Sequence, residues 1–164
     1  MTSIKDNYTQ TTKKWLEGFL FNKYSKEYKI EVIIPLSDIS KINNPSIKKI
    51  NNYSLLDFHP DVLGILTSKI NEGVNIILLN RSTSSISIKE IGEMNIYSQI
   101  INPIASFIVS LKGLPNEVNS LLLSDDICNS LLHYHNKEIV ILKIDEKGKI
   151  DNKSTFPRKL KDMF

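Results

Sequence analysis

The sequence predicts a single α/β domain, in which a mixed central β-sheet is flanked by helices on both faces. The chain has 164 residues, of which 41% are hydrophobic and 24% are charged, and this is enough to build one buried core. Short β-branched segments alternate with longer amphipathic segments in the order α-β-β-β-α-β-α-β. Neither an internal repeat nor an inter-domain linker interrupts this order, so we expect one domain.

The composition narrows the classes of protein to which the chain can belong. The formal net charge of +3 permits nucleic-acid binding without requiring it. Cys128 is the only cysteine, so an internal disulfide is excluded and a reduced, buried thiol is expected. The first residues lack the apolar segment of a secretory signal, and no apolar run approaches the roughly 20 residues that span a bilayer. We therefore expect a cytoplasmic protein without a membrane partner. The many Ile, Asn and Lys residues suggest an archaeal or viral source.

The individual elements follow from apolar periodicity and from the Gly, Pro and Asn residues between them. Residues 1–10 are expected to form an N-terminal arm, and residues 11–145 the domain itself. The polar stretch 37–53 is expected to be a loop that can include a helical turn. The predicted elements are a helix at 11–24, a strand at 28–36, an antiparallel hairpin of strands at 55–66 and 74–79, a helix at 84–101, a strand at 105–111, a helix at 116–133 and a strand at 138–144.

Two short polar motifs stand on neighbouring strands of this predicted sheet. Pro60-Asp61 lies in the strand at 55–66, and Asn80-Arg81-Ser82 ends the strand that follows it. Because side chains alternate along a strand, Asn80 and Ser82 are expected on one face. Glu93 and Tyr97 are one turn apart on the next helix. Together with the element order, these residues resemble the PD-(D/E)XK nucleases, a restriction-endonuclease-like superfamily that includes RecB-type enzymes.

The resemblance implies a restriction-endonuclease-like three-layer domain with a divalent-metal site. In that family, two carboxylates on neighbouring strands hold Mg²⁺ or Mn²⁺, and a lysine orients the attacking water. Asp61 matches the first carboxylate, but Asn80 stands in place of the second carboxylate and Ser82 in place of the lysine. Because neither residue carries a charge, we expect a nuclease fold with a degenerate active site and no cofactor, or Mg²⁺ or Mn²⁺ if the site is active.

The helix at 84–101 leaves a second possibility open. RecB-type members carry a Gln-X-X-X-Tyr pattern there, which Tyr97 keeps and Glu93 alters. The missing carboxylate could have moved to Glu90 or Glu93, with Lys89 supplying a cation, so that Asp61 and Glu90 hold the metal. The alternative is that these residues are solvated charges beside the apolar stripe of the helix.

The three histidines allow weaker hypotheses. Asp57, His59 and Asp61 alternate, so one strand face could present all three to a metal. His133 and His135 follow the helix at 116–133, where histidines complement the negative end of the helix dipole more often than they bind zinc.

Residues 146–164 are expected to form a basic C-terminal tail. Its charged side chains could contact nucleic-acid phosphates, although a solvated terminus is the simpler expectation. These side chains are Lys147, Lys149, Lys153, Arg158, Lys159 and Lys161. We expect a DNA- or RNA-associated binding subunit, or the silent partner of an active paralogous nuclease, as a homo- or heterodimer. An active Mg²⁺-dependent nuclease with a rearranged carboxylate and a protein-interaction module without nucleic acid are the alternatives.

Overall fold

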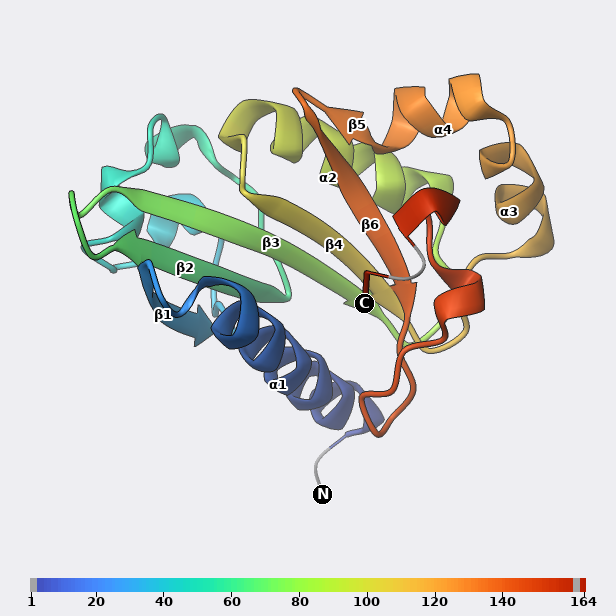
Figure 1. Cartoon of the computed structure of the whole chain (residues 1–164), viewed down its shortest axis with the longest axis horizontal. Helices are drawn as coiled ribbons and strands as arrows, with labels where there is room; N and C mark the ends of the chain where they lie inside the picture. The colour runs from blue at the N-terminus through green and yellow to red at the C-terminus, as the bar shows by residue number, and fades with distance from the viewer. Residues whose placement is uncertain (1–2, 161–162) are drawn as a thin grey trace.

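An open, six-stranded mixed sheet forms the centre of the molecule in the computed structural model of the chain (Figure 1). The structure describes residues 3–160, 163 and 164. The mixed α/β class that the sequence predicts is confirmed. In chain order, the helices and strands are α1 (Ile4–Tyr24), β1 (Tyr28–Ile33), β2 (Val62–Ser68), β3 (Val74–Ser82), α2 (Ile88–Ile101), β4 (Ala105–Ser110), α3 (Asn116–Leu122), α4 (Asp125–Leu132), β5 (His133–Tyr134) and β6 (Lys137–Lys143).

The strands lie side by side in the order β1-β2-β3-β4-β6-β5. β1, β2 and β3 form an antiparallel meander, which confirms the predicted hairpin between the second and third strands. α2 then crosses one face of the sheet, so that β4 lies parallel to β3, and β6 in turn lies parallel to β4. The short β5 pairs antiparallel with β6.

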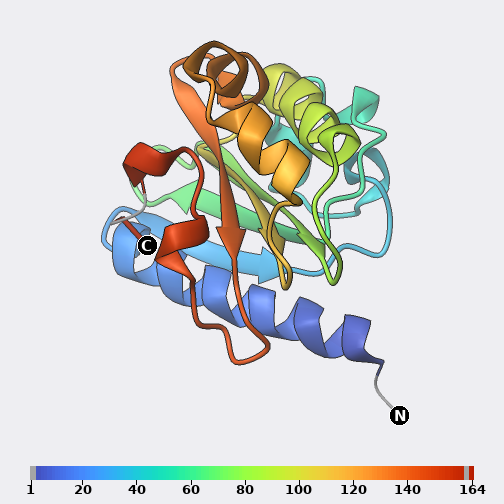
Figure 2. The ribbon, with the colours of Figure 1, turned by 90° about the vertical axis from the view of Figure 1, so that its right-hand side faces the viewer.

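The alternation of side chains along the strands gives the sheet two buried faces. On β3, Ile77 packs in the cluster to which α1 contributes Leu16, whereas Ile76 packs in the opposite cluster, to which α2 contributes Met94. Figures 1 and 2 show α1 on one face of the sheet and α2, α3 and α4 on the other. The sheet therefore lies between two layers of helices.

Two helices differ from their predicted extents. α1 begins at Ile4 rather than at residue 11, because Ser3 and Asp6 form a capping box at its start. The helix predicted at 116–133 is divided into α3 and α4. Ser124 precedes α4, and Asp125 in its first turn complements the positive end of the helix dipole. The prediction of one continuous helix was therefore wrong, although the sequence contained this start signal for α4.

The segment between β1 and β2 is more ordered than the predicted loop. It contains three 3₁₀ turns, at Ile39–Lys41, Ile47–Lys49 and Tyr53–Leu55, and it buries apolar side chains against the α2 face of the sheet. The strand predicted at 55–66 begins only at Val62. Pro60 precedes it and has no backbone N–H with which to join the sheet.

The C-terminal residues pack against the sheet, so the expectation of a solvated tail was wrong for the described part of it. Ile144 and Ile150 form an antiparallel bridge, and Phe156 pairs in the same way with Ile141. The Phe156 side chain is only 1% exposed. Lys161 lies outside the described residues.

None of the helices in the described part of the chain combines the length and the apolar character that crossing a membrane requires.

Candidate functional site

Asp61 stands at the start of β2, next to the end of β3, and the two polar motifs meet there. The backbone N–H of Asp61 donates to Asn80 Oδ1 at 3.4 Å. In the opposite direction, the backbone N–H of Arg81 donates to Asp61 Oδ2 at 2.9 Å. The antiparallel register, in which Val62 pairs with Leu79, produces this contact. The structure thus brings Pro60-Asp61 and Asn80-Arg81-Ser82 together.

Arg81 is the main partner of Asp61, and the sequence reasoning missed it. Arg81 Nη2 lies 3.6 Å from Asp61 Oδ1, and the arginine side chain is 8% exposed. Its Nε donates to Thr9 Oγ1 on α1 at 2.7 Å. A signal was available, since a cation near the end of a buried strand needs a nearby acid or hydroxyl.

A cavity of about 380 Å³ opens beside this ion pair. It lies between the first turns of α1, the chain after β1 and the start of β2. His59 is fixed at its wall, where Nε2 donates to the Pro35 carbonyl oxygen at 3.0 Å. The lining residues are Asp6, Thr9, Gln10, Ile34, Pro35, His59, Asp61 and Arg81.

Asn80 and Ser82 share the sheet face of Ile76 and Leu78, as their spacing predicts. Arg81 points to the opposite face, where α1 lies. Ser82 is buried, and its Oγ accepts the backbone N–H of Ser84 at 3.1 Å. The serine at the lysine position of the motif therefore fixes the turn that leads from β3 into α2.

The donor groups at Asp61 do not fit the Mg²⁺ or Mn²⁺ site that the resemblance implies. Such a site uses several oxygen ligands, with carboxylates supplying negative charge. Asp61 supplies one carboxylate, which Arg81 already engages, and the Asn80 oxygen is neutral and accepts the N–H of Asp61. Within residues 3–160, 163 and 164, no group of three or more His, Cys, Asp or Glu side chains is placed to hold a metal ion.

Of the two acidic residues of α2, Glu90 has another role and Glu93 faces solvent. Glu90 belongs to a capping box, in which its Oε2 accepts the N–H and the Oγ–H of Ser87 at 2.7 and 2.8 Å. Glu93 and Lys89 are exposed. In the described part of the chain, no hydrogen bond or ion pair joins Glu90, Glu93 or Lys89 to Asp61.

Tyr97 instead binds Asp57. Its hydroxyl donates to Asp57 Oδ1 at 2.7 Å, and its ring stacks on Phe58 with 4.4 Å between centroids. The hydrogen bond to Asp57, together with partial burial and the charges of Asp57, Glu93 and Asp38, raises the pKa of Tyr97 to about 12. Asp57 therefore faces α2.

Asp57, His59 and Asp61 do not share a strand face, which was possible only if Pro60 left the strand undisturbed. These residues precede β2 instead of lying within it, so the alternation of a strand does not apply to them. Only His59 and Asp61 line the cavity beside α1.

The two later histidines hold β5 to α2. His133 is the C-cap residue of α4, where histidine was expected, and its carbonyl oxygen accepts from Asn95 Nδ2 at 3.1 Å. His135 has a positive φ of 48°, and its Nε2 donates to the Gln99 carbonyl oxygen at 2.9 Å.

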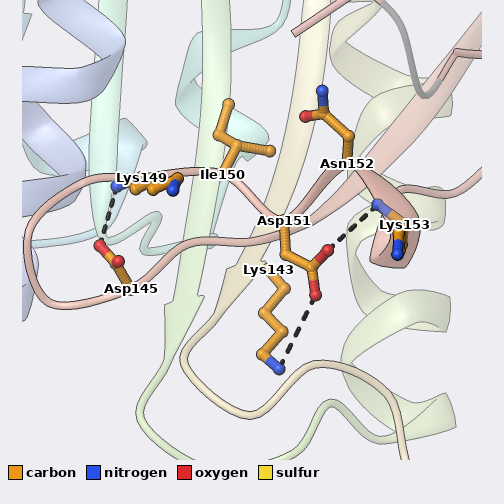
Figure 3. Close-up of a pocket in the computed structure, with 7 residues that line it drawn as sticks. All are labelled: Lys143, Asp145, Lys149, Ile150, Asp151, Asn152 and Lys153. Atoms are coloured by element: carbon orange, nitrogen blue, oxygen red, sulfur yellow. Dashed lines mark hydrogen bonds and ion pairs between the residues drawn. The ribbon is translucent and has the colours of Figure 1, made fainter.

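The described basic residues after β6 are exposed and divide into two groups by their position. Lys147, Lys149 and Lys153 lie on the turn and the returning segment. Asp145 Oδ1 accepts the backbone N–H groups of Lys147 and Lys149 at 2.9 and 2.8 Å. These hydrogen bonds and the two lysine charges lower the pKa of Asp145. Figure 3 shows Lys149 and Lys153 beside a cavity of about 530 Å³, together with the Lys143–Asp151 ion pair.

The second group fastens the C-terminal segment. Lys159 forms an ion pair with Glu138 on β6. The Arg158 guanidinium lies 4.4 Å from the centroid of the Phe156 ring and donates to Asn119 Oδ1 at 3.3 Å. These two residues are exposed as well, but they have structural partners within the chain.

The chain matches no protein-family model, and no curated protein matches it. Its function therefore has to be argued from the residues above.

Proposed function

We propose that the chain has a restriction-endonuclease-like fold with a degenerate active site. We propose that it serves as a nucleic-acid-associated binding subunit or as the silent partner of an active nuclease. The element order supports the fold, since α1, the β1-β2-β3 meander, the crossing helix α2 and the parallel β4 follow one another as the resemblance implies. The contact of Asp61 with Asn80 supports the assignment of the motif.

The proposed loss of catalysis is supported mainly by the contacts between Arg81 and the Asp61 carboxylate. Metal-dependent phosphodiester cleavage requires carboxylates that can hold a cation and polarise a water molecule. Here the guanidinium of Arg81 and its backbone N–H occupy both oxygens of the Asp61 carboxylate. Asn80 and Ser82 supply neither a second negative charge nor a mobile cation. This arrangement stabilises a charge pair and does not prepare a metal site.

Nucleic-acid association is supported by the exposed lysines of the loop after β6. Lys147, Lys149 and Lys153 lie within seven residues of chain, and lysines bind phosphates as point charges. Asp145 and Asp151 lie next to these lysines and accept hydrogen bonds from their backbone N–H groups, so we expect weak and strongly salt-dependent binding.

The test is fluorescence anisotropy with labelled DNA and RNA, single- and double-stranded, at about 50 and 200 mM salt. We expect wild-type protein to bind and the added salt to weaken binding by about tenfold or more. The triple variant Lys147→Glu/Lys149→Glu/Lys153→Glu should lose binding. The matched control is Lys26→Glu/Lys48→Glu/Lys112→Glu, which changes the net charge equally at exposed positions. Absence of binding at 50 mM salt would favour the protein-interaction role instead.

A further inference from the structure

β1 is an edge strand of the sheet. It stands first in the strand order and, among residues 3–160, 163 and 164, it pairs with no strand other than β2. Figure 1 shows it at the border of the sheet, with α1 alongside. An edge of this kind presents unpaired N–H and C=O groups, which can pair with another strand.

The hydrogen-bond pattern identifies which residues present those groups. Lys69 N donates to the Glu27 carbonyl oxygen at 3.0 Å, and these residues continue the register in which Tyr28 pairs with Ser68. Antiparallel pairs alternate between bonded and non-bonded. Lys29 and Glu31 therefore direct their backbone groups toward β2, whereas Tyr28, Ile30 and Val32 direct theirs outward. In the described part of the chain, these outward groups bond to no other backbone segment.

The side chains of β1 also separate by face. Tyr28, Ile30 and Val32 pack with the α1 cluster, while Lys29 and Glu31 are exposed on the other face. Asn44 Nδ2 donates to Glu31 Oε1 at 3.2 Å and holds that carboxylate near the edge. The strand is therefore apolar on one face and carries one cation and one anion on the other.

We propose that two copies of this chain associate through antiparallel pairing of their β1 strands, with the two-fold axis at Ile30. Ile30 then exchanges both backbone hydrogen bonds with Ile30 of the second copy, and Tyr28 does so with Val32. On the opposite face, Lys29 lies directly across from Glu31 of the second copy, at a non-bonded pair, where side chains approach most closely. The two sheets become one continuous sheet.

The charges select this register. Moving the two-fold axis to position 29 would place Lys29 opposite Lys29 of the second copy. Moving it to position 31 would place Glu31 opposite Glu31. Like charges directly opposite each other are destabilising. Of the axes at positions 29, 30 and 31, only the axis at Ile30 places opposite charges across from each other.

An apolar groove beside the edge supports the same dimer. It lies between α1 and β1, has a volume of about 410 Å³ and is lined by Glu17, Gly18, Phe21, Asn22, Ile30 and Val32. Phe21 is 65% exposed. The two-fold axis places α1 of each copy on the same face of the joined sheet, so each Phe21 is brought toward the second copy and loses exposure to water.

The oligomeric state tests the proposal, measured by sedimentation equilibrium over a range of protein concentrations. We expect wild-type protein to form a dimer. Lys29→Glu and Glu31→Lys should each weaken the dimer by about tenfold or more, because each places like charges opposite one another. The double variant Lys29→Glu/Glu31→Lys restores the complementary pairs and should restore the dimer. Lys112→Glu, at an exposed site outside β1, is the control and should remain dimeric.

Mixing the two single variants sharpens the test. The Lys29→Glu chain carries two acids on β1 and the Glu31→Lys chain carries two lysines, so the mixture should form a heterodimer that is tighter than the homodimer of either variant. Circular dichroism confirms that each variant is folded. A monomeric wild-type protein at all concentrations would overturn the proposal. So would a dimer that is unaffected by the single charge changes.

Discussion

Arg81 changes the interpretation of the site at Asp61, because it forms an ion pair with the carboxylate that a metal ion would need. The sequence made Asp61, Asn80 and Ser82 visible, because a hairpin places the motif of one strand beside that of the next. Arg81, between Asn80 and Ser82, was not identified as a site residue, since the alternation of side chains along β3 points it to the other face. On that face it meets Thr9 of α1 and the Asp61 carboxylate. The sequence signals that Arg81 needs an acid or hydroxyl partner, but the contact with Thr9 depends on how a distant helix packs on the sheet.

Replacing Arg81 should destabilise the fold. We expect Arg81→Met to lower the free energy of unfolding by about 2 kcal/mol, because the partly buried Asp61 carboxylate and Thr9 hydroxyl lose a partner. Urea denaturation measures the change. Asp61→Asn/Arg81→Met should lose less than the sum of the two single variants, since both remove the same interaction. Additive losses would show that Arg81 and Asp61 are not coupled.

Tyr97 should ionise late in the folded protein. Its hydrogen bond to Asp57 raises its pKa to about 12, above the ordinary value of about 10. Because the folded state holds the proton more tightly than the unfolded state, this residue's contribution to stability is complete below pH 10 and is lost as the pH rises toward 12. The difference between the ultraviolet titrations of wild type and Tyr97→Phe gives the pKa directly. Asp57→Asn should return the pKa toward 10, and an unchanged value would contradict the assigned cause.

At the scale of elements, segments with regular apolar periodicity were predicted correctly, whereas segments of mixed composition were not. The β2–β3 hairpin and α2 follow from long, strongly patterned segments. The segment before β2 has the composition of a strand, but Pro60 keeps it out of the sheet. The C-terminal segment has the composition of a solvated tail, because its lysines outnumber the two aromatic side chains that anchor it. These are Phe156, in the cluster on the α2 face, and Phe164, which packs against the cluster on the α1 face. Phe156 is buried beside β6, where it pairs with Ile141, and the composition of the segment does not reveal this pairing.

The packing of α1 on β2 depends on Gly64. A Cβ at this position would lie 2.9 Å from Leu20 Cδ1 and 3.2 Å from Ile77 Cβ. Gly64→Ala should therefore cost about 1–3 kcal/mol, because the helix or the strand must shift. Gly92→Ala is the matched control, since a Cβ there meets nothing within 4 Å and alanine favours the helix by about 0.5–1 kcal/mol. Thermal and urea unfolding should move in opposite directions for the two variants.

Phe156 should anchor the C-terminal segment to β6. We expect Phe156→Ala to lower the free energy of unfolding by about 3–4 kcal/mol, because it removes a buried ring. Limited proteolysis should then cut between residues 145 and 160. Leu123→Ala, at a side chain that is largely exposed, should change stability by less than about 0.5 kcal/mol. Equal losses in both variants would show that the segment is not held by Phe156.

At the scale of the whole molecule, the sequence predicted the α/β class and the layers of helices on both faces of the sheet. The contacts made by Asp61 became visible only in the packed structure. Three helices cover one face of the sheet and α1 covers the other, as the alternating pattern implied. The position of the charge pair between α1 and the sheet was not implied, and our proposal of a degenerate active site rests on this pair. The proposed β1 dimer adds a second level of organisation, which is independent of the motif.

The most direct test of the degenerate site is a cleavage assay. Purified wild-type protein is incubated with plasmid DNA, single-stranded DNA and RNA in the presence of Mg²⁺ or Mn²⁺, in parallel with Asp61→Ala prepared in the same way. Strand breaks are then quantified on gels. We expect the wild type to cleave no faster than Asp61→Ala on any substrate. Metal-dependent cleavage that Asp61→Ala abolishes would contradict the account and would establish an active nuclease.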